Sequence, residues 1–217
     1  AQAICLSDTC GHATPEGVRQ LVRFVKEEIL KASGIRLDWH GHNDRGLGVA
    51  NALAAFEAGA DRLHGTILGI GERSGNVALD QLMTNLTLMG VWEGDLTGLP
   101  ALADRVADLC GFEIPANYPV LGRDAFRTGT GVHAAAIVKA LRRGDVELAD
   151  AVYSGVPAAL VGRRQEIEIG PVAGHSNVMY WLELNGYDAS NERVERILAA
   201  AKQSRRILDE AEIRALL

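Results

Sequence analysis

The sequence predicts an α/β fold built on parallel strands, and three observations support this. Apolar segments typical of strands alternate with amphipathic segments of helical period over residues 3–90. Polar residues gather where each of these strands ends. No G-x-G-x-x-G run follows a strand, which disfavours a dinucleotide-binding sheet. The pattern therefore fits either a doubly wound sheet or a (β/α)8 barrel.

The elements follow in order along the chain. The first strand is expected at residues 3–7. Thr14 and Pro15 are typical of a helix start, with Thr14 as N-cap and Pro15 in the first helical position. Apolar residues at helical spacing extend this helix to Leu30. The next strand, helix, strand and helix are expected at residues 35–40, 46–58, 61–68 and 76–90.

The pattern changes after residue 93. Glycine, proline and acidic residues there indicate a linker, and the rest of the chain is mainly helical. We expect helices at residues 100–111 and 131–143 and two more within 190–217. The chain thus divides into a βα module and a mainly helical region.

Composition narrows the function classes. The chain has 217 residues and a formal net charge of -6, without a basic stripe, so we expect no nucleic-acid partner. No apolar run is long enough to span a membrane and no signal peptide is visible, so we expect a cytoplasmic protein. The three cysteines lack zinc-site spacing, and we expect them to act as reduced, buried apolar side chains.

His40 and His42 stand two residues apart at the end of a predicted strand. Side chains at i and i+2 of a strand point to the same face, so both imidazoles can converge on one ion. Imidazole nitrogen suits zinc and manganese, among other divalent ions. The alternative is a pair of ordinary core or surface histidines.

Two further stretches surround this pair. Asn43 and Asp44 follow it directly, and they either cap the next helix or orient the histidines. The Gly-rich loop 69–75 leaves the next strand and leads to Asn76, whose side-chain oxygen can face the same site. Glu72 in this loop can orient its neighbours. The alternative for this loop is a flexible surface turn with an asparagine helix cap.

Isolated residues complete the candidate set. Thr9 offers a hydroxyl at the end of the first strand, although a role in the turn is equally consistent. His133 lies in a glycine-flanked stretch and is a candidate acid or base. Tyr153 is a weaker candidate from the same half of the chain.

Four stretches, taken together, carry a family resemblance. In chain order they are LSDTCGHATP, HGHNDRGLGVANALAAFEAGAD, ILGIGERSGN and FRTGTGVHAAAIVKA. They resemble the acetyl-CoA-dependent, Claisen-condensing family of α-isopropylmalate synthase and homocitrate synthase. The resemblance covers essentially the whole chain, and the second and third stretches are its most specific part.

The resemblance implies roles for individual residues. His40, His42 and Asn76 correspond to ligands of a divalent metal ion (Mg, Mn or Zn), with Asp44 and Glu72 beside them. Thr9 corresponds to the residue that holds the carboxylate of the 2-oxo acid. Two residues correspond to catalytic groups for acetyl-CoA, namely His133 and Tyr153.

The resemblance also implies an architecture. It implies the later strands of a (β/α)8 TIM barrel followed by a mainly helical, two-part C-terminal region. The expected divisions are residues 1–93 for the barrel part, 94–150 for a helical subdomain and 151–217 for an α/β subdomain. The family's first barrel strand carries an Arg-Asp-Glu signature that has no counterpart here. We therefore expect the C-terminal portion of a longer, homodimeric enzyme, inactive by itself.

The activity implied is condensation of acetyl-CoA with a 2-oxo acid, foremost 2-oxoisovalerate to give 2-isopropylmalate, with release of CoA. Homocitrate, citramalate or phosphonomethylmalate synthase are alternatives within the family. A carbon–carbon lyase of the HMG-CoA lyase kind and an inactive fragment are alternatives from other classes. The long region after residue 96 argues against the lyase.

Overall fold

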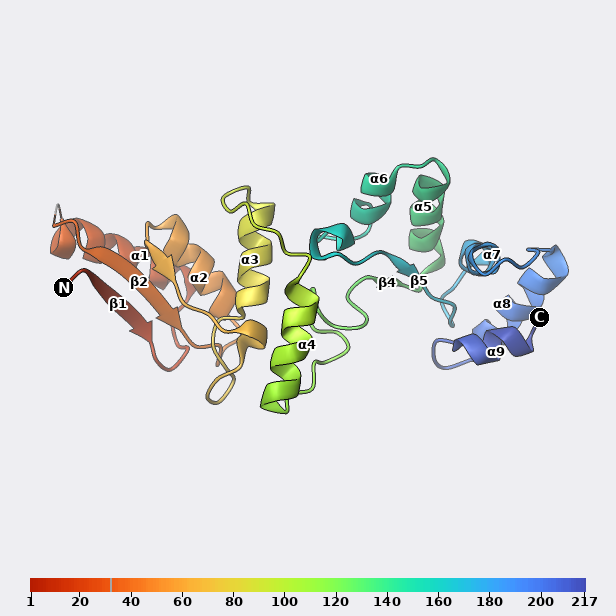
Figure 1. The fold of residues 1–217 in the computed structure, drawn as a ribbon, viewed down its shortest axis with the longest axis horizontal. Coiled ribbons are helices and arrows are strands. Elements are labelled where there is room, and N and C mark those ends of the chain that lie inside the picture. The colour runs from red at the N-terminus through yellow and green to blue at the C-terminus, as the bar shows by residue number, and fades with distance from the viewer. Residues whose placement is uncertain (32) are drawn as a thin grey trace. The chain divides into compact units, whose positions relative to one another are not determined.

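A computed structural model describes residues 1–31 and 33–217 of the chain. The chain divides into two compact units. The first unit comprises residues 1–94 and 99–114, and the second comprises residues 95–98 and 115–217. Figure 1 shows the helices and strands of each unit.

A small parallel sheet organises the first unit. Its strands are β1 (Ala3–Asp8), β2 (Arg36–Gly41) and β3 (Arg62–Leu63), in the order β1-β2-β3. Both neighbouring pairs are parallel, as the alternation of strands and helices predicts. The register sets Ser7 opposite His40 and Asp38 opposite Arg62.

The two faces of this sheet differ in chemistry. Leu37 and Trp39 of β2 are fully buried and pack with residues of α1 (Pro15–Phe24) and α2 (Gly48–Glu57). Because side chains alternate along a strand, Asp38 and His40 point to the other face. Strands of a parallel sheet are usually apolar on both faces. The polar face therefore marks the place where chemistry can reside.

The predicted start of the first helix is confirmed, whereas the end of this helix and the end of the third strand differ from the prediction. The Thr14 side chain accepts a hydrogen bond from the Gly17 amide at the start of α1. That helix ends at Phe24 and continues as a π-helical turn, η1 (Val25–Leu30), where one α-helix was expected.

The third strand is much shorter than the expected span 61–68. The strand ends at Leu63, and the His64 amide makes one more hydrogen bond, to Trp39 of β2. The chain then leaves the sheet, because Thr66 exchanges backbone hydrogen bonds with Val77 and Leu79 instead. A short 3-10 turn, η2 (Ile67–Gly69), follows. Two helices complete the unit, α3 (Leu79–Leu88) and α4 (Leu99–Cys110).

The second unit is mainly helical, with one pair of two-residue parallel strands, β4 (Arg127–Thr128) and β5 (Glu166–Ile167). One buried cluster centres on Ile137 and another on Ile197. The division at residue 150 stays a prediction. The helices are α5 (Gly131–Arg142), α6 (Val146–Ala151), η3 (Ala158–Val161), α7 (His175–Leu184), α8 (Asn191–Gln203) and α9 (Glu210–Ala215).

The cysteines correct one expectation. Cys5, Cys10 and Cys110 are free, but all three are exposed rather than buried. Cys5 lies on the polar face of β1, where apolar packing is not available to it. Within the described residues, the structure contains no helix with the length and apolarity needed to cross a bilayer.

Candidate metal and substrate site

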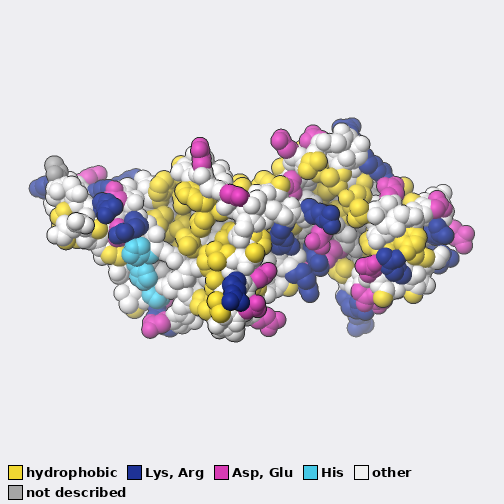
Figure 2. All heavy atoms as spheres, viewed as in Figure 1, with side chains coloured by type: hydrophobic (Ala, Val, Ile, Leu, Met, Phe, Trp, Pro, Cys, Tyr) yellow, Lys and Arg dark blue, Asp and Glu magenta, His cyan; other side chains and the backbone are white. Residues whose placement is uncertain are grey.

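Three histidines gather on the polar face of the sheet. The rings of His40 and His42 lie edge to face with centroids 5.2 Å apart, and the ring of His64 lies 5.7 Å from that of His40. Figure 2 shows histidine side chains gathered in one patch of the surface. The register explains the cluster, because β2 and the end of β3 bring these residues to the same edge.

The surroundings favour neutral imidazole at His40. Partial burial lowers the pKa of His40, and the positive charge that His42 and His64 can carry lowers it further. A neutral imidazole keeps the lone pair that a metal ion requires. His40 is therefore suited to binding a cation at neutral pH.

Asn76 is brought directly opposite His42. The two residues form an antiparallel bridge, flanked by hydrogen bonds from the Asn43 amide to Gly75 and from the Val77 amide to Gly41. Residues paired in this way carry their side chains close together. The helix expected from residue 76 begins only at Leu79, so the Asn76 side chain does not cap it.

Two buried polar atoms at this bridge lack a hydrogen-bond partner within the described residues. They are Nδ1 of His42 and Oδ1 of Asn76. The Asn76 amide nitrogen donates to the Ile70 carbonyl at 3.2 Å, which fixes the orientation of the amide and leaves its oxygen free. Buried polar atoms without partners are costly and call for an explanation such as a bound ion.

Glycines hold the loop that carries Asn76. Gly75 has φ +87°, and a Cβ built there would lie 2.0 Å from the Gly69 carbonyl oxygen. A Cβ on Gly71 would lie 2.2 Å from the side-chain nitrogen of Asn76. Only glycine fits such backbone approaches without displacing the neighbouring atoms. The glycines thus set where the asparagine side chain lies.

Arg73 ties three loops together. Its guanidinium donates to both carboxylate oxygens of Asp44, at 2.8 and 3.1 Å, and to the Thr9 carbonyl at 2.7 Å. The guanidinium also lowers the pKa of the Asp44 carboxyl. The Asp44 carboxylate thus binds Arg73, and the expectation that Asp44 orients the histidines stays a prediction. The Asn43 side chain binds the Gly48 amide at the start of α2.

The remaining predicted residues of this unit lie at the rim. The Glu72 side chain is 84% exposed, and its contact among the described residues is with Arg73, at 3.5 Å. Thr9 is exposed at the end of β1, and its backbone carbonyl is tied by Arg73.

Sequence reasoning missed a buried network beside the histidines. Asp38 is 5% exposed and accepts two hydrogen bonds from Arg62, at 2.5 and 3.1 Å, and it lies 3.6 Å from Nε2 of His64. The Arg62 bonds lower the pKa of Asp38. The signal that could have found it is the alternation itself, since Asp38 shares a strand face with His40.

His133 and Tyr153 come together in the second unit. Their rings are stacked, with centroids 3.9 Å apart and planes 23° apart. His133 lies in the first turn of α5 and Tyr153 just after α6, and both side chains are exposed. The structure thus pairs two residues that lie twenty positions apart in the sequence.

The donor set fits a divalent ion. No group of three His, Cys, Asp or Glu side chains in the described parts of the chain could hold a metal. Two imidazoles and one amide oxygen are nevertheless available at His40, His42 and Asn76, and two of their atoms are buried without partners. Nitrogen and oxygen donors of this kind suit Mn or Zn, and more weakly Mg. These residues fit the expected metal as a partial ligand set.

Comparison with known proteins identifies related sequences. Residues 1–106 match the family model described as HMGL-like. A 2-isopropylmalate synthase of Pyrococcus furiosus is 35% identical over 208 residues, which cover 94% of this chain and 40% of that protein. An (R)-citramalate synthase of Aquifex aeolicus is 34% identical over 210 residues, which cover 94% of this chain and 37% of that protein.

A solved HMG-CoA lyase from Acinetobacter baumannii, in complex with coenzyme A and 3-methylmalate, is 34% identical and covers 52% of this chain and 39% of its own, with a TM-score of 0.47. The chain spans about 40% of the length of the curated relatives described above. The HMGL-like segment belongs to the N-terminal part of those proteins. The expectation that the chain corresponds only to the C-terminal portion of such enzymes is therefore wrong.

Proposed function

Because this chain belongs to the HMGL-like family through residues 1–106, we propose that it forms part of an acyltransferase that condenses acetyl-CoA with a 2-oxo acid. The foremost candidate acid is 2-oxoisovalerate, with 2-isopropylmalate and free CoA as products. Relatives named as synthases of 2-isopropylmalate and of citramalate support the reaction class. Homocitrate and phosphonomethylmalate synthase are the further alternatives within this class.

The observation that carries the proposal is the pair of unpartnered buried atoms on His42 and Asn76, beside His40. A divalent ion bound there would act as a Lewis acid and as a template for the 2-oxo acid. His40 and His42 would hold it through their imidazole nitrogens, and Asn76 would contribute its amide oxygen. The Thr9 hydroxyl holds the carboxylate of the acid.

His133 and Tyr153 are proposed to act on acetyl-CoA. His133 takes a proton from the acetyl methyl group, and the resulting carbanion attacks the carbonyl carbon of the 2-oxo acid. Tyr153 stacks on the imidazole and holds it in place. Hydrolysis of the thioester then releases CoA and makes the condensation effectively irreversible. The proposed enzyme is a homodimer.

The test uses the complete protein with acetyl-CoA and a panel of 2-oxo acids, and it follows the release of the CoA thiol. We expect release that depends on the acid and on added Mn, Mg or Zn, and that His133→Ala abolishes. Cleavage of HMG-CoA without any condensation would replace the proposal with a lyase. The 217-residue polypeptide by itself should be inactive. Turnover by this polypeptide would refute the proposal that its site is incomplete.

A further inference from the structure

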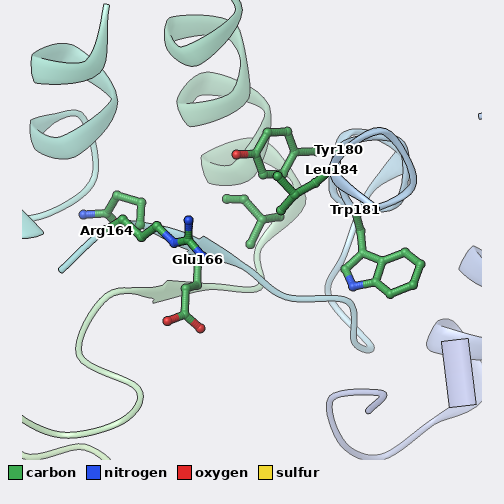
Figure 3. Close-up of a pocket in the computed structure, with 7 residues that line it drawn as sticks. Arg164, Glu166, Tyr180, Trp181 and Leu184 are labelled. Carbon is green, nitrogen blue, oxygen red and sulfur yellow. The ribbon is translucent and has the colours of Figure 1, made fainter. Parts of the chain in front are cut away.

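A pocket of about 260 Å³ lies wholly within the second unit, away from the residues used above. One wall is the segment that leads into β5, including Arg164 and Glu166, and the other is α7, with Tyr180, Trp181 and Leu184. In Figure 3 the Tyr180 ring extends from α7 toward the segment that carries Arg164. The pocket therefore combines aromatic rings with a cation.

Two consecutive arginines next to this pocket differ in what they do. Arg163 donates to three backbone carbonyls, at 2.7 to 3.4 Å, and its guanidinium lies 4.9 Å from the centroid of the Phe126 ring. Arg164 has an exposed side chain and no hydrogen bond or ion pair with any described residue. Arg163 is thus a structural residue, whereas the charge of Arg164 is available to a ligand.

The acidic group of the pocket, Glu166, pairs with another arginine and not with Arg164. The Glu166 carboxylate lies 3.1 Å from Nε of Arg127, a guanidinium that it shares with Asp124 and Glu168. Gln165 is also engaged, because its side-chain nitrogen donates to Asp150. Arg164 therefore remains the cation of the pocket lining that has no ion pair among the described residues.

The aromatic wall offers a stacking surface. The Tyr180 hydroxyl has no hydrogen bond with the described residues, and Leu184 is 66% exposed although it is apolar. The Trp181 ring already has a neighbour, because the guanidinium of Arg214 lies over it, 5.9 Å from the ring centroid. Tyr180 and Leu184 are therefore the groups with free apolar surface, which a flat ring could cover.

From this arrangement we propose that the pocket binds a purine nucleotide. The base stacks against Tyr180 and covers Leu184, and the phosphate binds the guanidinium of Arg164. Stacking on an aromatic side chain and a charge-assisted bond from arginine to phosphate are the usual means of holding these two parts of a nucleotide. The nucleotide is either free in solution or is the adenine end of coenzyme A.

This inference stands apart from the proposed function, because it uses no residue of the histidine cluster or of the His133–Tyr153 pair. Condensation activity could be absent while the nucleotide still binds. The reverse also holds, so failure of one proposal is distinguishable from failure of the other.

The test is calorimetric titration of the full chain with adenosine 5′-monophosphate and, separately, with coenzyme A. We expect Arg164→Ala to weaken binding of the monophosphate about tenfold or more, as loss of one charge-assisted bond would. Tyr180→Leu should weaken it by about tenfold through loss of stacking, whereas Tyr180→Phe keeps the ring and should stay within about twofold.

Arg143→Ala is the matched control, because Arg143 is exposed in the same unit and does not line the pocket. It should leave the affinity unchanged. Displacement of the monophosphate by coenzyme A would identify the adenine end of coenzyme A as the ligand, and binding of the monophosphate alone would identify a free nucleotide. No binding of either at millimolar concentration, inorganic phosphate binding equally well, or indifference to both Arg164→Ala and Tyr180→Leu would overturn the proposal.

Discussion

The histidines of the two units are held in different ways. In the first unit, His42 and Asn76 face each other because backbone hydrogen bonds on either side of them fix the bridge. In the second unit, His133 meets Tyr153 through ring stacking between residues at the ends of two helices. The relative position of the two exposed rings in the second unit depends on their side-chain rotamers. The relative position of His42 and Asn76 in the first unit depends on the main chain.

This difference shows which substitutions each site tolerates. A site fixed by the backbone is sensitive to changes in the residues that shape the loop, including those that never touch a ligand. A stacked pair is sensitive mainly to its own two side chains. The predictions below test this contrast, starting from the largest effect.

Gly75→Ala should destabilise the first unit by about 2–4 kcal/mol, because an alanine at φ +87° is strained and its Cβ would meet the Gly69 carbonyl oxygen. Gly155→Ala in the second unit is the control, since nothing lies within 4 Å of its Cβ position. The free energy of unfolding from urea titration measures both. Equal stability of the two variants would show that the glycine loop does not constrain the first unit.

His42→Ala should weaken Mn or Zn binding about 100-fold or more, because it removes a buried ligand candidate that Asn76 and His40 cannot replace. His133→Ala should leave the affinity for the ion unchanged. Calorimetric titration with the metal alone provides the readout. His12→Ala, which removes an exposed imidazole of the first unit, controls for non-specific binding. A metal affinity that falls equally in all three variants would contradict the assignment.

Arg73→Ala should weaken binding of the same ion about tenfold, as is typical of changes in residues that orient ligands. Arg73 joins Asp44 to the Thr9 carbonyl across three loops. Arg123→Ala in the second unit removes an exposed guanidinium whose ion-pair partner among the described residues is its neighbour Asp124. That variant should bind the ion normally. A wild-type affinity for Arg73→Ala would show that the loops hold their positions without the arginine.

The smallest expected effect is a difference in pH response between the units. The Leu37 amide and Lys26 lower the pKa of Asp61 in the first unit, whereas burial raises the pKa of Glu168 in the second. The Asp61 carboxylate therefore stabilises the fold at neutral pH, and this stabilisation is lost as the pH falls below about 3.9 and through the lowered pKa. Glu168 opposes folding when ionised, so the second unit should gain stability as the pH falls through its raised pKa.

Amide hydrogen exchange, read separately for each unit at pH 7 and at about pH 3, below the unperturbed pKa of both carboxyl groups, measures this difference. Glu168→Gln should increase protection of the second unit at pH 7 and remove its gain on acidification. Asp61→Asn should reduce protection in the first unit alone. Parallel behaviour of both units in wild type would contradict the opposite signs.

The sequence predicts best what local chemistry determines. The N-cap at Thr14, strands β1 and β2 and the shared direction of His40 and His42 follow from residue types and periodicity. The early end of the third strand does not, because it results from backbone bonds between Thr66 and residues beyond the glycine loop. Apolar residues continue past that point and give no sign of the change.

Contacts between residues far apart in the sequence were the other feature that the sequence could not predict. The contacts of Arg73 with Asp44 and Thr9 span 29 and 64 positions, and periodicity carries no information at such separations. The approach of His64 to His40 likewise depends on the register between two strands. Motif resemblance pointed to the loop, but the specific pairing of its arginine came only from the structure.

The loop before Asn76 contains three residues with positive φ besides its closing Gly75, namely Leu68, Gly69 and Arg73. These backbone conformations are set when the first unit folds, before any ion binds. An ion bound at His42 and Asn76 would order little additional backbone, so little conformational entropy of the chain would be lost on association. Binding of this kind should be fast and should change hydrogen exchange in the loop very little.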